Sequence, residues 1–349
     1  MSDLQTNDGK RPLLQRFMTS DDNLNRLIII SLSIFVLMAV LNSGRFVTMR
    51  NFRSMSYSFP ELGLLSLGLT LCMITGGIDL SVVGTANLTS ILAAKIMAEQ
   101  MPADATGSTL WLYLALAVVV ALTVGLAGGL VNGFLVSTFN IHPVLVTLGT
   151  WQVFSGIAIV LTEGYAVPGF PEQFLFLGNA RLLGLPVPLY VFVVFAIFVA
   201  ILLNRTQLGL SIYLIGTNIT AARFAGVRVR SVLIRTYMSS ALLASVAGLV
   251  MIARTNQAKA DYGESYILQA VLVNLLAGVN WAGGFGRVIG VAIAVLTLQF
   301  LSSGFNMLRF NNFARDFTWG VFLIAVMVFN YVMNERKARR EANLAADNA

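Results

Sequence analysis

Hydrophobic residues occur along the chain in long blocks that are separated by short polar connections. A helix that crosses a bilayer needs about 20 mostly apolar residues, and most of the blocks approach that length. Ten blocks can be counted, at residues 27–41, 62–78, 80–97, 110–134, 144–161, 187–203, 232–253, 267–279, 288–308 and 317–333. The pattern predicts an all-α polytopic membrane protein with about ten transmembrane helices.

The polar ends of the chain set the domain boundaries. Residues 1–25 and 335–349 are expected to be polar tails, and residues 26–334 to form a single transmembrane domain. No connection between blocks is long enough for a folded extramembrane domain of about 100 residues. Any domain that converts energy is therefore expected on another chain.

The basic residues predict the orientation, because Lys and Arg are retained in cytoplasmic connections. The tail after the last block and the connection at residues 204–231 are rich in arginine, whereas residues 98–109 contain no Lys or Arg. With an even number of spans, both termini are expected in the cytoplasm. Arg45, Arg50 and Arg53 are the exception, since this topology places them outside.

Composition supports the membrane prediction. Hydrophobic residues make up 57% of the 349 positions and charged residues only 11%, against about 25% charged residues in a soluble domain. The net charge of +7 comes from arginines scattered among the connections, which is not the basic patch of a nucleic-acid-binding protein. The single cysteine, Cys72, excludes a disulfide within the chain and a cysteine metal cluster.

The first segment with candidate chemistry joins blocks two and three and contains Gly76, Gly77, Asp79 and Ser81. The glycines end one helix, and Asp79 is expected to cap the next helix by accepting backbone N–H bonds. An ionisable residue inside a membrane is also a candidate for ion relay. A capped tight turn at the membrane edge, an ion-relay carboxylate and a contact with another chain are therefore the three interpretations.

The second segment lies in the arginine-rich connection. Asn218 is a suitable N-cap and Gly226 a suitable left-handed stop, so about two turns of helix are expected between them. Ala221 and Ala222 would give this helix a small apolar surface, and Arg223 adds charge. The helix is either a solvated connector or a docking site for a cytoplasmic protein.

The third segment follows block eight. Glycine occupies positions 278, 283, 284, 286 and 290, which is incompatible with a regular helix, so the backbone is expected to reverse there between packed helices. A contact with a pore or a partner is the alternative interpretation.

Signals for an enzyme are missing from the sequence. None of the four lysines lies in a phosphate-binding loop, and the only histidine, His142, precedes Pro143 at a predicted helix start. No serine, histidine and aspartate set or paired catalytic carboxylate is apparent. We therefore expect no catalytic residue, no metal site and no cofactor on this chain.

Together these segments resemble the membrane permease of bacterial ribose-type (monosaccharide) ABC importers, a group that includes the importers of autoinducer-2. The resemblance covers residues from about 62 to 333. It is carried by Gly76 to Val82, by Pro143 to Thr150, by the glycine-rich turn after block eight, and by a cytoplasmic pattern on Tyr213, Gly216, Asn218, Ala221, Ala222 and Gly226.

The resemblance implies a bacterial inner-membrane subunit that forms the pathway for a monosaccharide or similar small polar solute. A second permease chain, homologous or identical, would complete the pathway, and an extracytoplasmic binding protein would deliver the solute. A cytoplasmic ATPase would hold ATP and Mg and dock on the loop that contains Tyr213, Gly216, Asn218, Ala221, Ala222, Arg223 and Gly226.

Several residues remain as candidates within this interpretation. Asn132, Thr147 and Asn274 are candidate pathway residues, and Asn274 either faces the pathway or pairs with Gln269. An outer aromatic segment with Tyr165, Phe170, Phe174 and Phe176 is either a face for the binding protein or a packed loop. An ion-coupled secondary transporter and a membrane scaffold without transport are the alternative functions.

Overall fold

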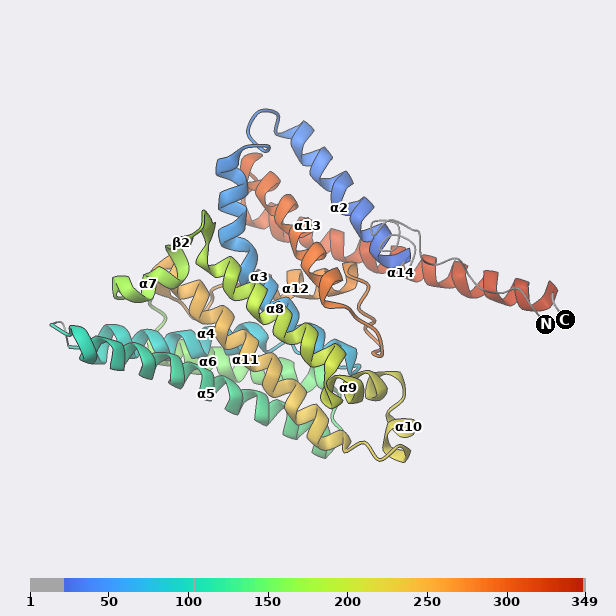
Figure 1. Cartoon of the computed structure of the whole chain (residues 1–349), viewed down its shortest axis with the longest axis horizontal. Helices are drawn as coiled ribbons and strands as arrows, with labels where there is room; N and C mark the ends of the chain where they lie inside the picture. Colours follow the sequence, from blue (N-terminus) through green and yellow to red (C-terminus); the bar gives the residue numbers. More distant parts are fainter. Residues whose placement is uncertain (1–21, 103, 348–349) are drawn as a thin grey trace.

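The computed structural model describes residues 22–102 and 104–347, and this part of the chain is almost entirely helical (Figure 1). The longer helices are α2 (Asp22–Leu41), α3 (Met49–Ile74), α4 (Val82–Lys95), α5 (Gly107–Phe139), α6 (Pro143–Thr162), α8 (Val187–Arg205), α11 (Val229–Thr255), α12 (Ser265–Leu276), α13 (Val288–Met307) and α14 (Asn312–Asp347). The shorter helical elements are η1 (Ile96–Gln100), α7 (Glu172–Asn179), α9 (Gln207–Thr217) and α10 (Ile219–Phe224).

Each of the ten predicted blocks falls on one of the longer helices, which confirms an all-α polytopic membrane protein. Among the described residues, seven helices are long and apolar enough to cross a membrane, namely α2, α3, α5, α6, α8, α11 and α13. The other three are α4, which has 14 residues before η1 continues it as a π-helix, α12, which has 12 residues, and α14, which has 36. The count of ten spans stays a prediction.

The two predicted tails have different outcomes. Most of residues 1–25 lie outside the described residues, and α2 already begins at Asp22. At the other end, α14 continues to Asp347 and extends beyond the neighbouring helices in Figure 1. The segment expected as a separate tail from residue 335 is therefore helical as far as Asp347.

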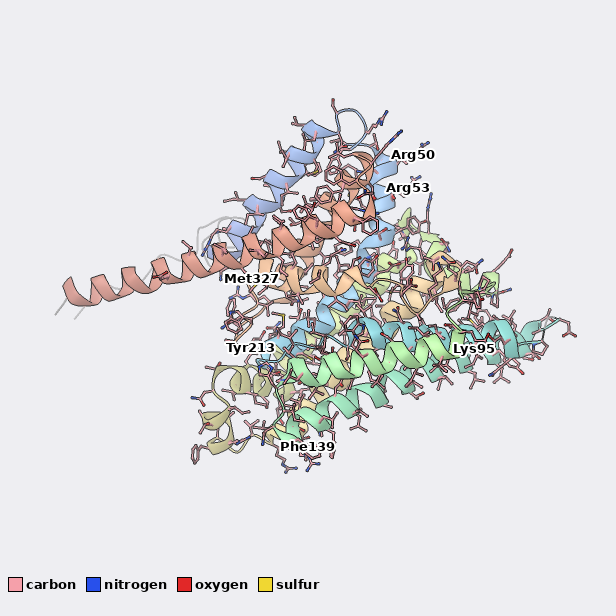
Figure 2. The ribbon with its side chains drawn as sticks, turned by 180° about the vertical axis from the view of Figure 1, so that it is seen from behind. Arg50, Arg53, Lys95, Phe139, Tyr213 and Met327 are labelled. Atoms are coloured by element: carbon pink, nitrogen blue, oxygen red, sulfur yellow. The ribbon has the colours of Figure 1, made fainter. Side chains whose placement is uncertain are left out.

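Helix α3 begins earlier than the predicted block at residues 62–78. Thr48 caps it by accepting the Asn51 N–H at 3.3 Å, and Arg50 and Arg53 are exposed in its first turns. The polar side chains of the first turns lower the local hydropathy, so the hydropathy pattern does not indicate this helix start. Figure 2 shows Arg50 and Arg53 at the end of the molecule opposite Tyr213.

Helix α11 is central and packs against α3, α4 and α5. Gly125, Gly129 and Gly133 form the face of α5 that meets it, and a Cβ at Gly129 would lie 2.6 Å from the Tyr237 carbonyl oxygen. Close helix approach through small residues is the usual packing mode in lipid. These glycines therefore form the packing face between α5 and α11.

Two pairs of short antiparallel strands join connections between the helices. β1 (Val167–Pro168) pairs with β4 (Gln257–Ala258), so the segment after α6 is held against the segment after α11. β2 (Arg181–Leu182) and β3 (Leu185–Pro186) form a hairpin directly before α8. Leu183 and Gly184 both have positive φ angles, of 52° and 83°, as a two-residue hairpin turn requires.

Candidate functional site

Asp79 is buried in the turn between α3 and α4 and holds this turn together. The Asp79 side chain is 1% exposed. One carboxylate oxygen accepts the Ser81 N–H at 3.1 Å and the Ser81 hydroxyl at 2.6 Å, and the other accepts the Ser240 hydroxyl of α11 at 2.8 Å. The aspartate therefore bonds its own turn to the central helix.

Two further helices are bonded to the same turn. Asn132 of α5 donates from Nδ2 to the Ser81 hydroxyl at 2.8 Å. The Thr147 hydroxyl of α6 lies 2.9 Å from the Ile78 carbonyl oxygen and accepts the Leu80 N–H at 3.1 Å. The turn thus joins α3, α4, α5, α6 and α11 at one place.

The role expected for Asp79 as the N-cap of the next helix is wrong. Ser81 occupies the N-cap position of α4 and makes no side-chain cap bond. Asp79 does accept a backbone N–H, but that N–H belongs to Ser81 inside the turn, and the second oxygen reaches α11. The bonds of this carboxylate fit a structural role that spans several helices.

The second segment folds as the sequence predicts. Asn218 caps α10, and its Oδ1 accepts the N–H groups of Thr220 at 2.9 Å and Ala221 at 3.0 Å. Gly226 follows the helix with a φ of +80°, which a residue with a side chain rarely adopts. The short helix between Asn218 and Gly226 is confirmed.

The surface of α10 is mixed. Ala222 is buried, whereas Ala221 and Arg223 are exposed. Phe224 is 89% exposed, and this aromatic side chain was not singled out by the sequence pattern. An exposed aromatic residue beside an arginine is typical of a protein interface.

The three glycine segments, far apart in sequence, meet at one point. The Gly284 N–H donates to the Ile74 carbonyl oxygen at 2.8 Å, and the Tyr213 hydroxyl donates to the Gly286 carbonyl oxygen at 2.7 Å. A Cβ at Gly216 would collide with the Ile74 carbonyl oxygen and with the Gly284 nitrogen. We call this contact of Gly76, Gly216, Gly283 and Gly284 the glycine junction.

The late glycine turn has the predicted reversal. Helix α12 ends at Leu276 and α13 begins at Val288. Gly278, Gly283 and Gly284 between them have φ angles of +76°, +94° and +82°, so the backbone cannot continue as a helix. Because Gly283 and Gly284 contact Gly216, the turn connects to the segment that carries α10.

The three candidate pathway residues are all buried in a single copy of the chain. Asn132 and Thr147 bond the α3–α4 turn, as described above. Asn274 lies 2.6 Å from the Thr70 hydroxyl and donates to the Ser66 carbonyl oxygen at 3.1 Å, so it joins α12 to α3. The alternative that Asn274 pairs with Gln269 is not among these contacts. The pathway assignment of the three residues stays a prediction.

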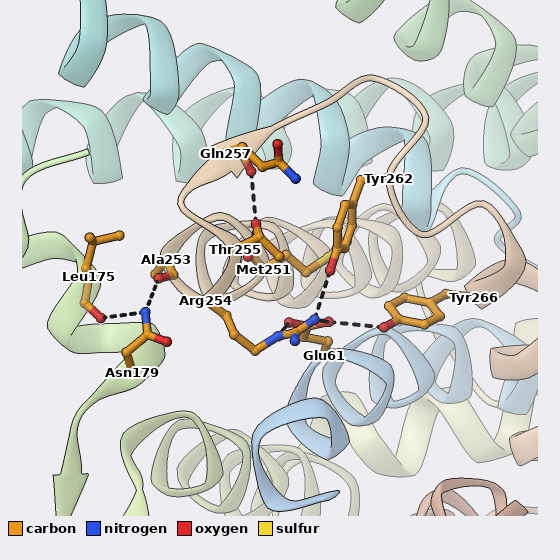
Figure 3. A network of polar contacts seen from close by, with 10 residues as sticks. All are labelled: Glu61, Leu175, Asn179, Met251, Ala253, Arg254, Thr255, Gln257, Tyr262 and Tyr266. Atoms are coloured by element: carbon orange, nitrogen blue, oxygen red, sulfur yellow. Dashed lines mark hydrogen bonds and ion pairs between the residues drawn. The ribbon is translucent and has the colours of Figure 1, made fainter. Parts of the chain in front are cut away.

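A buried ion pair that the sequence pattern did not reveal lies at the C-terminal end of α11 (Figure 3). Arg254 of α11 contacts both carboxylate oxygens of Glu61 on α3 and donates to the Tyr262 hydroxyl at 2.8 Å. Tyr266 donates to Glu61 at 3.1 Å. Burial, and after it the Glu61 carboxylate, raises the pKa of Tyr262 to about 12. A charged residue within a predominantly apolar helix was the available signal for Glu61.

The outer aromatic segment divides into two parts. Phe170 and Phe174 are buried and pack edge to face, with ring centroids 5.9 Å apart. Tyr165 and Phe176 remain exposed. Only the second pair is available to another protein in the structure described here.

Comparison with known proteins places the chain among transport permeases. Residues 51–330 match the family model described as "Branched-chain amino acid transport system / permease component". The autoinducer 2 import system permease protein LsrD of Yersinia enterocolitica is 32% identical over 77% of this chain and 80% of its own length. The LsrD proteins of Enterobacter sp. and Escherichia coli are 33% and 31% identical, over 77% and 81% of this chain and 81% and 84% of their own lengths.

No solved structure matches the chain. The resemblance to ribose-type ABC importer permeases is confirmed by the family model and by these relatives. The family consists of transport subunits, which agrees with the prediction that this chain is not an enzyme. The chain belongs to this permease family and is a multi-pass inner-membrane subunit of a bacterial ABC importer.

Proposed function

We propose that this chain forms one half of the pathway of an ATP-driven importer for a monosaccharide-like solute. Autoinducer 2, the solute that the names of its relatives give, is the first solute to test. The separate ATPase would hold ATP and Mg, and this chain would contribute no bond chemistry. The similarity over more than three quarters of the chain supports this assignment.

The observation that carries the mechanism is the glycine junction. Gly216 lies at the end of α9, two residues before the cap of α10. Its backbone contacts both Ile74 and Gly284 without intervening side chains. Closely packed protein interiors transmit displacement. Movement of α10 by a docked ATPase would therefore move the end of α3 and the turn before α13. The bonds of Asp79, Asn132 and Thr147 would carry that movement to α5, α6 and α11.

The proposed topology has ten spans and cytoplasmic termini. It assigns α10, the connection at residues 204–231 and the glycine junction to the cytoplasmic side. The arginines of the connection support this orientation, because basic residues are retained in the cytoplasm. Arg50 and Arg53 then lie at the outer end of α3, opposite Tyr213 in Figure 2.

The second permease chain and the extracytoplasmic binding protein are the other proposed partners. On the outer side, Tyr165, Phe176 and Leu183 offer exposed apolar side chains to a binding protein. Leu183 is 99% exposed at the tip of the hairpin that precedes α8. The Tyr190 hydroxyl donates to the Leu182 carbonyl oxygen at 2.8 Å and fixes this hairpin on α8.

The three candidate pathway residues are buried, so the solute would reach them only after the helices separate. They are Asn132, Thr147 and Asn274. They lie where α5, α6 and α12 meet the α3–α4 region, and their bonds would have to rearrange in the transport cycle. A solute with many hydroxyl groups needs such polar partners in an otherwise apolar pathway.

Substitutions in α10 test the proposed coupling. Ala221→Glu introduces a charge on the exposed surface of α10, and Gly226→Pro replaces a residue whose φ of +80° proline cannot adopt. Both should abolish ATPase co-purification and uptake while the chain still inserts into the membrane. Ala221→Ser is the matched control and should retain both. Unchanged co-purification of the ATPase with the Ala221→Glu chain would refute the docking role of α10.

A further inference from the structure

The Glu61 and Arg254 pair lies well inside the span of α3 and is only partly enclosed. Glu61 follows Met49, the first residue of α3, by 12 residues, which corresponds to about 18 Å along the helix. The Glu61 side chain is fully buried, whereas the Arg254 side chain is 25% exposed. Ionisable residues at such a depth face water or the interior of a bundle, because exposure to lipid is costly. In the proposed topology, the exposed part of Arg254 therefore faces water on the outer side.

Arg254 and Tyr262 have hydrogen-bond donors that the ion pair does not use. The Nε and Nη2 atoms of Arg254 make its bonds to Glu61 and to the Tyr262 hydroxyl. Among the described residues, none accepts a hydrogen bond from the Nη1 atom of Arg254 or from the Tyr262 hydroxyl. Burial raises the pKa of Tyr262 to about 12, so this hydroxyl keeps its proton at neutral pH. Both side chains can therefore donate to a ligand.

A second pair of an arginine and a tyrosine lies one turn further out on α3. Tyr57 precedes Glu61 by four residues, so the two side chains project from the same face of the helix, with Cβ atoms about 5–6 Å apart. The Arg181 Nε donates to the Tyr57 hydroxyl at 2.9 Å, and Tyr57 donates to the Asn179 carbonyl oxygen at 3.1 Å. Asn179 in turn donates at 2.8 Å to the carbonyl oxygen of the residue before Arg254 (Figure 3).

Asn179 therefore connects the two pairs, and we call Tyr57, Arg181, Arg254 and Tyr262 the outer arginine–tyrosine cluster. The cluster fits a neutral polyhydroxyl ligand better than an anion. Both carboxylate oxygens of Glu61 contact Arg254 and compensate its charge. Arg181 is exposed, so water and salt screen its charge. Hydroxyl oxygens can accept from the free N–H and O–H groups without bringing a further charge, and the tyrosine rings offer apolar faces to the carbon skeleton of a sugar.

We propose that the outer arginine–tyrosine cluster binds the hydroxyl groups of a neutral polyhydroxyl solute as it enters the pathway from the outside. Arg254 and Tyr262 donate to one end of the solute, and Arg181 donates to the other. The inference rests on the proposed function, because its ligand is the transported solute and its side of the membrane is the outer one. Asn132 and Thr147 bond the turn at the opposite end of α3, so they would act after this site.

Protection of an introduced cysteine tests the proposal on this chain alone. Asp261→Cys places a thiol at an exposed position beside Tyr262, and the native Cys72 is buried. In the intact importer complex, without ATP, D-ribose as a neutral probe should slow the reaction of this thiol with a membrane-impermeant maleimide. Adding Tyr262→Phe or Arg181→Gln should raise the D-ribose concentration for half-protection about twofold to tenfold, the effect of losing one hydrogen bond.

Matched controls lie elsewhere on the outer side. Tyr113→Phe at the start of α5 and Arg309→Gln after α13 should leave the half-protection concentration unchanged. D-ribose should also leave the labelling of a Met49→Cys chain unchanged, since this exposed residue lies at the far outer end of α3.

Three results would overturn the proposal. They are the absence of protection by D-ribose, equal half-protection concentrations for the Tyr262→Phe and Tyr113→Phe chains, and protection by ribose 5-phosphate at a concentration more than tenfold lower than that of D-ribose. The last result would identify an anion site. Labelling requires neither ATP nor uptake, so ATP-driven uptake by a chain that fails this test would leave the importer assignment intact and remove only the outer solute site.

Discussion

At the scale of single residues, Gly216 leaves no room for a side chain. A Cβ there would collide with backbone atoms of two other segments, whereas a Cβ at Gly149 in α6 would meet nothing within 4 Å. Forcing extra volume into packed regions costs about 1–3 kcal/mol. We expect Gly216→Ala to reduce ATP-driven uptake by about tenfold or more, since that cost corresponds to roughly a 5- to 150-fold change in an equilibrium.

Uptake normalised to the amount of permease in the membrane measures this effect. The Gly149→Ala chain is the control, and it should transport at the wild-type rate because the added methyl group has open space. Equal losses in the two variants, or full activity of the Gly216→Ala chain, would show that the glycine junction has no special role.

Ser240 allows a second test at the residue scale. Its hydroxyl donates to the buried Asp79 carboxylate at 2.8 Å, while the neighbouring Ser239 hydroxyl bonds only to the Arg235 carbonyl oxygen of its own helix. Hydrogen bonds to charged groups contribute about 1.5–3 kcal/mol. Ser240→Ala should therefore lower the thermal stability of the purified protein clearly, and Ser239→Ala should not. Identical melting of the two variants would contradict the structural role of Asp79.

Local features near these residues were predictable from sequence, and distant contacts were not. Asn218 and Gly226 act on backbone groups within a few positions, so the residue types alone predicted the short helix. By contrast, Thr70 and Asn274 are 204 positions apart, and Asp79 and Ser240 are 161 apart. Hydrophobic periodicity in a single sequence does not indicate such distant pairings. This explains why Asp79 was expected to cap α4 and why the bonds of Asn274 to Thr70 and Ser66 were not foreseen.

At the scale of helices and their connections, the Glu61 and Arg254 pair holds α3 to α11. Removing one partner of a buried ion pair costs about 3–5 kcal/mol, because the other charge stays buried. Glu61→Ala should thus destabilise the protein strongly. The double variant Glu61→Ala, Arg254→Ala should lose less stability than the sum of the two single variants. Thermal unfolding of the four proteins in one detergent measures this coupling.

The exposed pair Lys95 and Glu99 is the matched control for this cycle. Its charges are 2.6 Å apart on a single helical stretch, and surface pairs contribute about 0–1 kcal/mol. Glu99→Ala should change the unfolding temperature little. An equally small effect of Glu61→Ala would mean that the buried pair does not join the two helices.

Helix ends were predicted less well than helix positions. Every predicted block corresponds to a helix. Helix α3, however, begins 13 residues before its block, because Arg50, Asn51 and Arg53 lower the hydropathy of its first turns. The helical continuation of α14 to Asp347 was concealed in the same way by its charged residues. Hydropathy identifies the part of a helix that lipid surrounds. The polar extensions of a helix are identified only from the structure.

At the scale of the whole molecule, the proposed topology is open to labelling of introduced cysteines. Cys72 is buried, so the background from the native thiol should be low. Met49→Cys and Leu183→Cys, both at exposed positions, should react with a membrane-impermeant reagent in intact cells. Phe224→Cys should react only after the membrane is opened. Labelling of Phe224→Cys in intact cells would contradict the orientation.

In the proposed importer, this chain forms the pathway and a separate ATPase supplies the energy. No lysine of this chain lies in a phosphate-binding loop, and α10 connects through the glycine junction to the buried turn around Asp79. The most direct test is solute uptake by cells that carry the complete importer. Uptake should persist when the proton gradient is collapsed and ATP is maintained, and should stop when ATP is depleted. Uptake that follows the proton gradient and continues without ATP would contradict the account and identify an ion-coupled transporter.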